Sequence, residues 1–165
     1  MSIRRPNSRW RMVFLVCFTV LSAYLPVASN AQDSLSAGQT VYVPIYSHIY
    51  SGDREHPFQL TAIVSIRNTD PRLPITVGTV DYYDTDGRLL RSYLDKPVVV
   101  KPLASVRYVV GESDKSGGSG AKFIVKWRSD TPLNPPIIEG VMIGTKMQQG
   151  ISFVSRGQAI VEAGH

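Results

Sequence analysis

The chain has 165 residues, of which 43% are hydrophobic and 19% are charged, and its formal net charge is +5. Four of the 18 basic residues are arginines at positions 4, 5, 9 and 11, and none of the 13 acidic residues precedes Asp33, so residues 32–165 carry a formal charge of +1. Nucleic-acid binding needs a concentrated positive field. Because the charges of these residues are interspersed in sign, we exclude a nucleic-acid partner.

The N-terminal residues follow the order of a secretory signal peptide. The arginines are followed by an apolar run from Val13 to Leu25, and then by small residues that end at Ala31. This order predicts cleavage after Ala31 and export to the periplasm or the extracellular space. The apolar run is shorter than the roughly 20 residues of a membrane-spanning helix. We therefore expect no transmembrane span after cleavage, with an uncleaved membrane anchor as the alternative.

The single cysteine, Cys17, lies within the predicted signal peptide, so residues 32–165 have no thiol for a disulfide, a metal or catalysis. Their number is usual for one domain and is large enough to bury a core without cross-links. We expect a flexible leader over residues 32–39, one domain over residues 40–160 and a tail over residues 161–165. We expect this domain to be a monomer or to self-associate weakly.

The first part of the domain shows the period of two that is typical of half-buried β-strands. Thr40–Ile45 alternates, and Pro44, which has no N–H to donate, predicts that this run is an edge strand. Phe58–Arg67 is the clearest run, because five of its apolar side chains share one parity: Phe58, Leu60, Ala62, Val64 and Ile66. Both runs therefore predict one face buried in a core.

The next run, Ile75–Tyr83, changes its apolar parity near Gly78, which predicts a β-bulge there. Asp84–Gly87 predicts a hairpin turn, because an Asp-Gly pair tolerates the positive φ angles that such turns need. Arg88–Tyr93 would then be the returning strand of this hairpin.

The second part of the domain contains further alternating runs separated by turn residues. In Ala121–Arg128 the apolar side chains alternate with basic ones, so we expect Trp127 to be buried in the core. A proline-rich connection, Thr131–Pro136, precedes the last pair of strands. The other expected strands are Val98–Val100, Ser105–Val110, Ile137–Gly144 and Ile151–Ser155.

These runs amount to eight or nine short strands, and no window has a helical period of useful length. Regularly spaced short strands with turn signals between them predict an all-β fold. We expect an immunoglobulin-like β-sandwich, and a small β-barrel is the alternative.

Four segments carry a family resemblance: Val41–Tyr50, Ser65–Asp70, Asp81–Gly87 and Ser116–Ala121. They resemble a family of small exported bacterial proteins that is known as a domain of unknown function. The resemblance implies an envelope or secreted location, and it supplies no activity, substrate or catalytic residue. A looser likeness to immunoglobulin-like accessory domains, carried by Asn68-Thr69 and Pro102–Ser105, implies the same fold and no function.

One candidate binding surface is an aromatic strip on the first predicted strand. Tyr42, Tyr46, His48 and Tyr50 share one parity, and Pro44 interrupts them. A row of amphipathic rings holds a glycan or an extended peptide by stacking and by hydrogen bonds from hydroxyl groups. In the competing interpretation, the rings cover the end of the sandwich and their hydroxyls are in water.

A second candidate surface is the glycine-rich loop that follows Ser105–Val110. Because glycines have no side chain, an anion could come close to the backbone of this loop and accept hydrogen bonds from its N–H groups. However, the loop lacks the Gly-Lys-Ser/Thr of a phosphate-binding loop and the glycine spacing of a nucleophile elbow, and a flexible hairpin connection is the competing interpretation. The residues of this candidate surface are Asp114, Ser116, Gly117, Gly118, Ser119 and Gly120.

The acidic residues around the predicted turn resemble the start of a calcium loop. Asp84 and Asp86 alternate as calcium ligands do, but Arg88 takes the third ligand position and no bidentate glutamate follows at the right distance. We therefore expect Asp84 to accept hydrogen bonds from the backbone of its own turn.

The histidines give no strong metal signature. His48 and His56 flank a loop that contains Asp53 and Glu55, but their spacing is not that of a zinc site. We therefore expect no metal, no cofactor and no catalytic residue in this chain.

These observations favour an exported, non-catalytic module that binds a peptide, a glycan or another envelope partner. One alternative is an envelope hydrolase or metal-dependent enzyme that uses His48 with Asp53 and nearby carboxylates, or with the serines of the glycine-rich loop. Another alternative is a structural domain of an envelope assembly.

Overall fold

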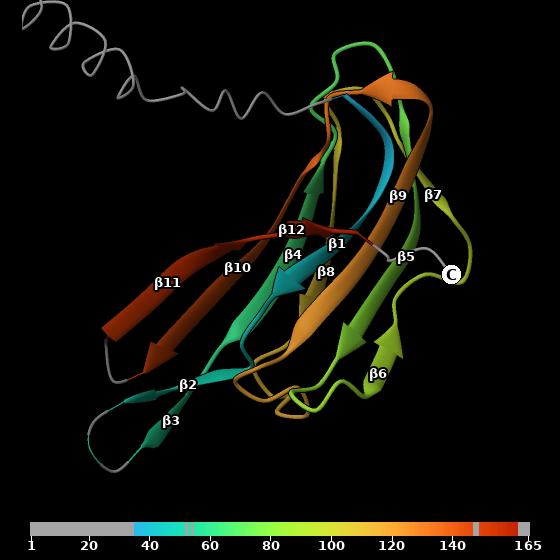
Figure 1. Ribbon diagram of the computed structural model, residues 1–165. Coiled ribbons are helices and arrows are strands. Elements are labelled where there is room, and N and C mark those ends of the chain that lie inside the picture. Colours follow the sequence, from blue (N-terminus) through green and yellow to red (C-terminus); the bar gives the residue numbers. More distant parts are fainter. Residues whose placement is uncertain (1–34, 52, 54, 147–148, 162–165) are drawn as a thin grey trace, which may run out of the picture. The chain divides into compact units, whose positions relative to one another are not determined.

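The computed structural model of the protein describes residues 35–51, 53, 55–146 and 149–161 (Figure 1). They belong to one compact unit, Asp33–His165. The predicted signal peptide and the last four residues of the predicted tail lie outside the described residues. Within the described part of the chain all regular structure is β, and no helix there is long and apolar enough to cross a membrane.

The described residues form two open antiparallel sheets and a short two-stranded ribbon. The first sheet has the order β12-β1-β9-β5-β6, with β7 also paired to β5, the second has the order β11-β10-β4-β8, and β2 pairs with β3. Neither sheet closes on itself, so the fold is a sandwich and not the barrel alternative. The strands are β1 (Ser36–Pro44), β2 (His48–Ser51), β3 (His56–Gln59), β4 (Thr61–Arg67), β5 (Ile75–Tyr83), β6 (Leu89–Ser92), β7 (Val98–Val100), β8 (Ser105–Val110), β9 (Lys122–Leu133), β10 (Ile137–Lys146), β11 (Gln149–Arg156) and β12 (Gln158–Ile160).

The central strands are paired as in an immunoglobulin sandwich, in which A, B, E and D form one sheet and C, F and G the other. The pair β4–β8 takes the places of B and E, and the pair β5–β9 takes the places of C and F. The outer strands are exchanged, because β1 pairs with β9 where strand G would lie and β10 pairs with β4 where strand A would lie.

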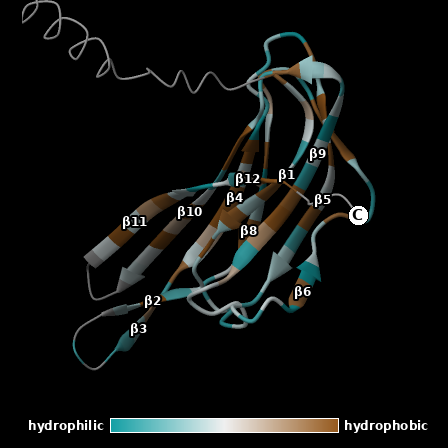
Figure 2. Ribbon diagram, in the orientation of Figure 1, coloured by the Kyte–Doolittle hydropathy of each residue, from teal (hydrophilic) through white to brown (hydrophobic). Residues whose placement is uncertain are grey.

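The core consists of the side chains that the period of two predicts to face inward. Figure 2 shows hydrophobic residues along the central parts of strands in both sheets. Every apolar residue of the run Phe58–Ile66 that was expected to face the core is buried, as is Trp127 with 4% exposure. The predicted bulge at Gly78 is present as a register shift between Val77 and Thr79 against β9. Gly87 has a φ of 84°, as the predicted hairpin turn requires.

The predicted strand Phe58–Arg67 is divided at Leu60. The Leu60 N–H donates to the Ser47 carbonyl at 2.9 Å, while β3 before it pairs with β2 and β4 after it pairs with β10 and β8. The period of two therefore continues through a change of partner, which a single-strand pattern does not reveal.

The prediction that the first strand is an edge strand is wrong over Thr40–Tyr42, where β12 pairs with it. β1 lies between β9 and β12, and it begins at Ser36, inside the predicted leader. β12 pairs only with Thr40–Tyr42, so Pro44 has β9 on one side and no ladder partner from β12 on the other. Proline is confined to strand positions that lack a ladder partner on one side. Pro44 is such a position, but its presence does not make the whole strand an edge strand.

The predicted proline-rich connection also begins later than expected. β9 continues through Thr131 and Pro132 to Leu133, which is 1% exposed. Leu133 is the register partner of Ser36, so the two extensions beyond the predicted strands pair with each other.

We expect Trp127→Ala to lower the free energy of unfolding by about 3–5 kcal/mol, because it removes a large buried aromatic side chain from the core. In residues 32–165 Trp127 is the single tryptophan, and its emission in the folded state should be blue-shifted. Val99→Ala on β7, where the side chain is 62% exposed, is the control and should change stability by less than about 0.5 kcal/mol. Urea denaturation followed by circular dichroism measures both variants, and tryptophan fluorescence follows the wild type and Val99→Ala. Water-like emission from folded protein would contradict this core assignment.

Candidate functional site

The glycine-rich loop is fastened to the turn between β5 and β6. The Gly117 carbonyl accepts hydrogen bonds from the backbone N–H and the hydroxyl of Thr85, at 2.9 and 3.0 Å, and the Gly120 N–H donates to Thr85 Oγ1 at 3.1 Å. Ser116 donates from its N–H and its hydroxyl to Asp114 Oδ1, at 3.0 and 2.5 Å. The loop is therefore a fixed hairpin connection, and much of its polar surface is engaged within the protein.

A buried tyrosine explains the glycine at the centre of this loop. A Cβ on Gly117 would lie 2.1 Å from the hydroxyl oxygen of Tyr82, which is 1% exposed. This hydroxyl is 3.2 Å from Ser47 Oγ, and the ring stacks on Phe123 at a centroid distance of 5.3 Å. Burial raises the pKa of Tyr82, and the Ser47 hydrogen bond partly opposes that rise. Gly117 thus serves packing against the core.

The predicted aromatic strip is divided among three parts of the chain. Tyr42 lies on β1, whereas Tyr46 follows the end of β1 and packs edge-on against Phe153 of β11 at 5.7 Å. His48 and Tyr50 lie on β2, where His48 Nε2 and the Tyr50 hydroxyl are 3.1 Å apart. The rings therefore do not form one row on one strand.

The glycine-rich loop and part of the aromatic strip nevertheless meet at one end of the sandwich. The Ser47 N–H donates to the Gly118 carbonyl at 3.1 Å, and the Ile45 N–H donates to the Ala121 carbonyl at 3.0 Å. Because these bonds join the β1–β2 connection to the loop, His48 and Tyr50 lie beyond the same end. Tyr50 is 54% exposed, so this end offers one aromatic ring to solvent.

The acidic turn has the structural role that the sequence predicts. Asp84 Oδ1 accepts hydrogen bonds from the N–H groups of Asp86 and Arg88, at 3.0 and 2.8 Å, and Asp84 Oδ2 pairs with Arg88 Nε at 3.1 Å. The bond from the Arg88 N–H is the main cause that lowers the pKa of Asp84. No group of three or more His, Cys, Asp or Glu side chains able to hold a metal occurs among the described residues.

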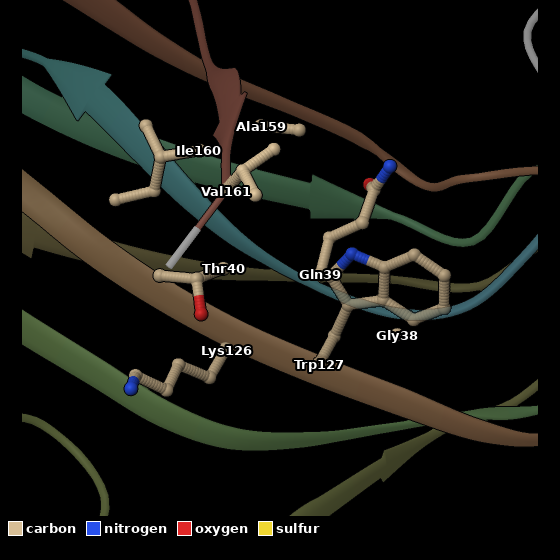
Figure 3. Close-up of a pocket in the computed structure, with 8 residues that line it drawn as sticks. All are labelled: Gly38, Gln39, Thr40, Lys126, Trp127, Ala159, Ile160 and Val161. Carbon is tan, nitrogen blue, oxygen red and sulfur yellow. The ribbon is translucent and has the colours of Figure 1, made fainter. Parts of the chain in front are cut away.

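A hollow that the sequence did not predict lies where β12 ends beside β1, with a volume of about 580 Å³ (Figure 3). Its floor comes from β1 and β9, and β12 forms the opposite wall. We call it the first hollow. Its lining residues are Gly38, Gln39, Thr40, Lys126, Trp127, Ala159, Ile160 and Val161.

Trp127 is one of the residues that line the first hollow. Gln39 is its register partner on β1, and Figure 3 shows the Gln39 side chain next to the nitrogen edge of the ring. Trp127 Nε1 is buried and has no hydrogen-bond partner among the described residues. At Gly38 a Cβ would lie 2.9 Å from the Trp127 carbonyl oxygen, so a glycine here allows β1 to lie close to β9.

A second hollow of about 500 Å³ lies on the other side of the β1–β12 pair, and it shares Gln39 and Ala159 with the first. Its walls combine polar and apolar surface in about equal parts, and Glu139 and Arg156 supply its charges. Glu139 also pairs with Arg67 at 3.4 Å. The lining residues of the second hollow are Gln39, Val41, Pro135, Pro136, Ile137, Ile138, Glu139, Arg156, Gly157 and Ala159.

Sequence reasoning missed both hollows for a physical reason. They depend on β12, a strand of three residues that is exposed along its whole length and shows no alternation of burial. The available signal was Gly157, where a Cβ would lie 2.7 Å from both the Ile138 carbonyl oxygen and Val41 Cγ1. A glycine in that position marks a close crossing of strands, but the pattern alone does not say which strands cross.

A family model described as "Protein of unknown function (DUF3124)" matches residues 38–160. The chain belongs to this family. The family resemblance noted in the sequence is thereby confirmed, while the exported location stays a prediction. No curated protein matches the chain. Among solved structures, a crystal structure of Thermotoga maritima 1070 is similar, with 12% sequence identity, a TM-score of 0.44, and coverage of 73% of this chain and 92% of that chain.

We expect Gly117→Ala to lower the free energy of unfolding by about 1–3 kcal/mol, because the added methyl overlaps the Tyr82 hydroxyl and overpacks the core. Gly111→Ala, where the nearest atom to the added Cβ is 3.9 Å away, is the control and should be nearly neutral. In a Tyr82→Phe background the cost of Gly117→Ala should fall, because the overlapping hydroxyl is absent. A double-mutant cycle by urea denaturation measures this coupling. Strictly additive effects would contradict the packing role of Gly117.

We expect Asp84→Asn to reduce the loss of stability in acid. Because the pKa of Asp84 is lowered in the folded state, its contribution is present above the ordinary value of 3.8 and is lost as the pH falls through the lower folded value. Urea denaturation at pH 7 and at decreasing pH below 4 should show a smaller acid-dependent change for the variant than for the wild type. Asp86→Asn, an exposed change in the same turn, should retain the wild-type dependence. Equal behaviour of the two variants would contradict the assignment.

Proposed function

We propose that this protein is exported to the cell envelope and acts there as a non-catalytic module that binds an extended chain, a peptide or a glycan strand, of an envelope partner. The observation that carries the proposal is the pair of hollows that flank the β1–β12 pair and share Gln39 and Ala159. Both volumes fall within the roughly 300–1,000 Å³ of ligand pockets, and the walls of both combine polar and apolar surface.

An extended ligand fits this arrangement better than a compact one. The two hollows lie on either side of the β1–β12 pair, and β12 pairs with β1 only over Thr40–Tyr42. In the described part of the chain, no strand lies along the outer edge of Ser36–Gln39. A peptide that passes the end of β12 would meet this backbone edge and could form main-chain hydrogen bonds with it.

The charges of the lining favour a ligand with carboxylate groups. Lys126 lines the first hollow and Arg156 the second, and the single carboxylate of either lining, Glu139, pairs with Arg67. The linings of the two hollows thus contain two basic side chains and one carboxylate, whereas residues 32–165 are almost neutral as a whole.

Two buried carboxylates have structural roles in turns rather than the role of a general acid. Asp84 accepts turn hydrogen bonds as described above, and Asp70 Oδ1 accepts bonds from the N–H groups of Arg72 and Leu73, at 2.9 and 2.8 Å. These bonds lower the pKa of Asp70 as well. A general acid needs a pKa near the working pH, and both groups are shifted in the opposite direction.

The test is binding of residues 32–165 to defined arrays of extended peptides and of glycan strands. We expect a subset of acidic extended ligands to bind, and Ala159→Trp, which fills the residue shared by both hollows, to weaken that binding at least about tenfold, a loss of roughly 1.4 kcal/mol. Gln158→Trp is the matched control, because it adds the same ring to the same strand outside both linings and should bind as the wild type does.

Tyr50→Ala tests the other end of the sandwich. If this variant loses binding while Ala159→Trp keeps it, the ligand lies at the aromatic and glycine-rich end, and the assignment to the hollows is wrong. Absence of binding on both arrays would contradict the proposed function, and turnover of the bound ligand by the wild type would contradict its non-catalytic part.

A further inference from the structure

The four edges of the two sheets differ in how they are protected. β12 has three residues, and β6 has four with a register irregularity against β5. β8 is covered in part, because the Tyr93 hydroxyl donates to the Val109 carbonyl at 3.0 Å. β11 has eight residues and, within the described part of the chain, pairs with β10 alone. Figure 1 shows no strand beyond β11 on its outer side.

The edge of β11 also lacks the devices that keep strand edges apart. Proteins protect long edges with proline, lysine, bulges or inward charges. Gln149–Arg156 contains no proline and no lysine, its register with β10 runs without a shift, and its one charge is Arg156 at the end. An edge of this kind is suited to pairing with another strand.

An apolar row leads across the outer face of the sheet to this edge. Val109, Ile63, Val141 and Val154 are successive register partners on β8, β4, β10 and β11. Val154, at the open edge, is 56% exposed. On the opposite face of β11, Phe153 is only partly buried. Both faces of β11 therefore have apolar surface that a further strand would cover.

We propose that β11 pairs antiparallel with β11 of a second copy of this chain, so that the two four-stranded sheets become one sheet of eight strands. An antiparallel strand is its own complement about a twofold axis. A register with Val154 opposite Val154 of the second copy joins the two apolar rows, and it places Arg156 opposite Ser152 rather than opposite another arginine. The charges of β11 therefore do not oppose this pairing.

The oligomeric state of residues 32–165 tests the pairing. Light scattering with size-exclusion chromatography should give twice the mass of one chain, and Val154→Lys should return it to the mass of one chain, because the two lysines would face each other. Val109→Lys is the matched control. It makes the same substitution in the same apolar row at the opposite edge, and it should leave the dimer intact.

A disulfide tests the register directly, because residues 32–165 contain no cysteine. Facing residues of antiparallel strands have Cα atoms about 4.5–5.5 Å apart, within the range of a disulfide. Val154→Cys should therefore give a covalent dimer in air, and Val109→Cys should not. This measurement decides the matter if Val154→Lys fails to fold by circular dichroism. A wild-type monomer at high concentration, equal effects of the two lysine variants, or cross-linking at Val109 rather than Val154 would overturn the proposal.

Discussion

The path of β1 is the constraint on which the rest of the sandwich depends. β1 pairs with β9 in one sheet, and at Pro44 it reaches the other sheet, where the Ser155 hydroxyl donates to the Pro44 carbonyl. The crossing is so close that a Cβ on Gly140 of β10 would lie 2.9 Å from the Pro44 carbonyl oxygen. The next residue, Ile45, is fully buried and donates to the Ala121 carbonyl. β1 therefore joins both sheets to the glycine-rich loop.

The two faces of each strand could be predicted from the sequence, but the partner of each strand could not. The period of two reports burial, so it found Trp127 and the full inward set of Phe58–Ile66. It carries no information on pairing, because a strand keeps its parity when its partner changes, as it does at Leu60. The same limit explains why the edge prediction from Pro44 did not extend along β1. The missing N–H concerns one position and says nothing about Thr40–Tyr42, which pairs with β12.

Among the residues of the candidate sites, the glycines were those whose roles were hardest to predict from the sequence. A glycine is equally compatible with a positive φ, a close approach of a ligand and a close approach of the protein itself. Gly87 is the first case, with a φ of 84°, and its Asp-Gly context made it predictable. Gly117 is the last case, because the atom nearest to its added Cβ is a hydroxyl from β5. Tyr82 is 35 residues earlier in the chain, so local sequence could not distinguish a ligand from a packed side chain.

The path of β1 also relates the hollows to the open edge. Because β1 and β12 close one side of the sandwich and β12 ends after Ile160, a hollow remains on each side of their pair. β11 precedes β12 by a single residue, Gly157, whose N–H donates to the Ile138 carbonyl at 2.8 Å. Arg156 thus belongs both to the lining of the second hollow and to the edge that would pair. Ligand and second copy would act on the same side chain, and any effect of one on the affinity of the other must then be reciprocal.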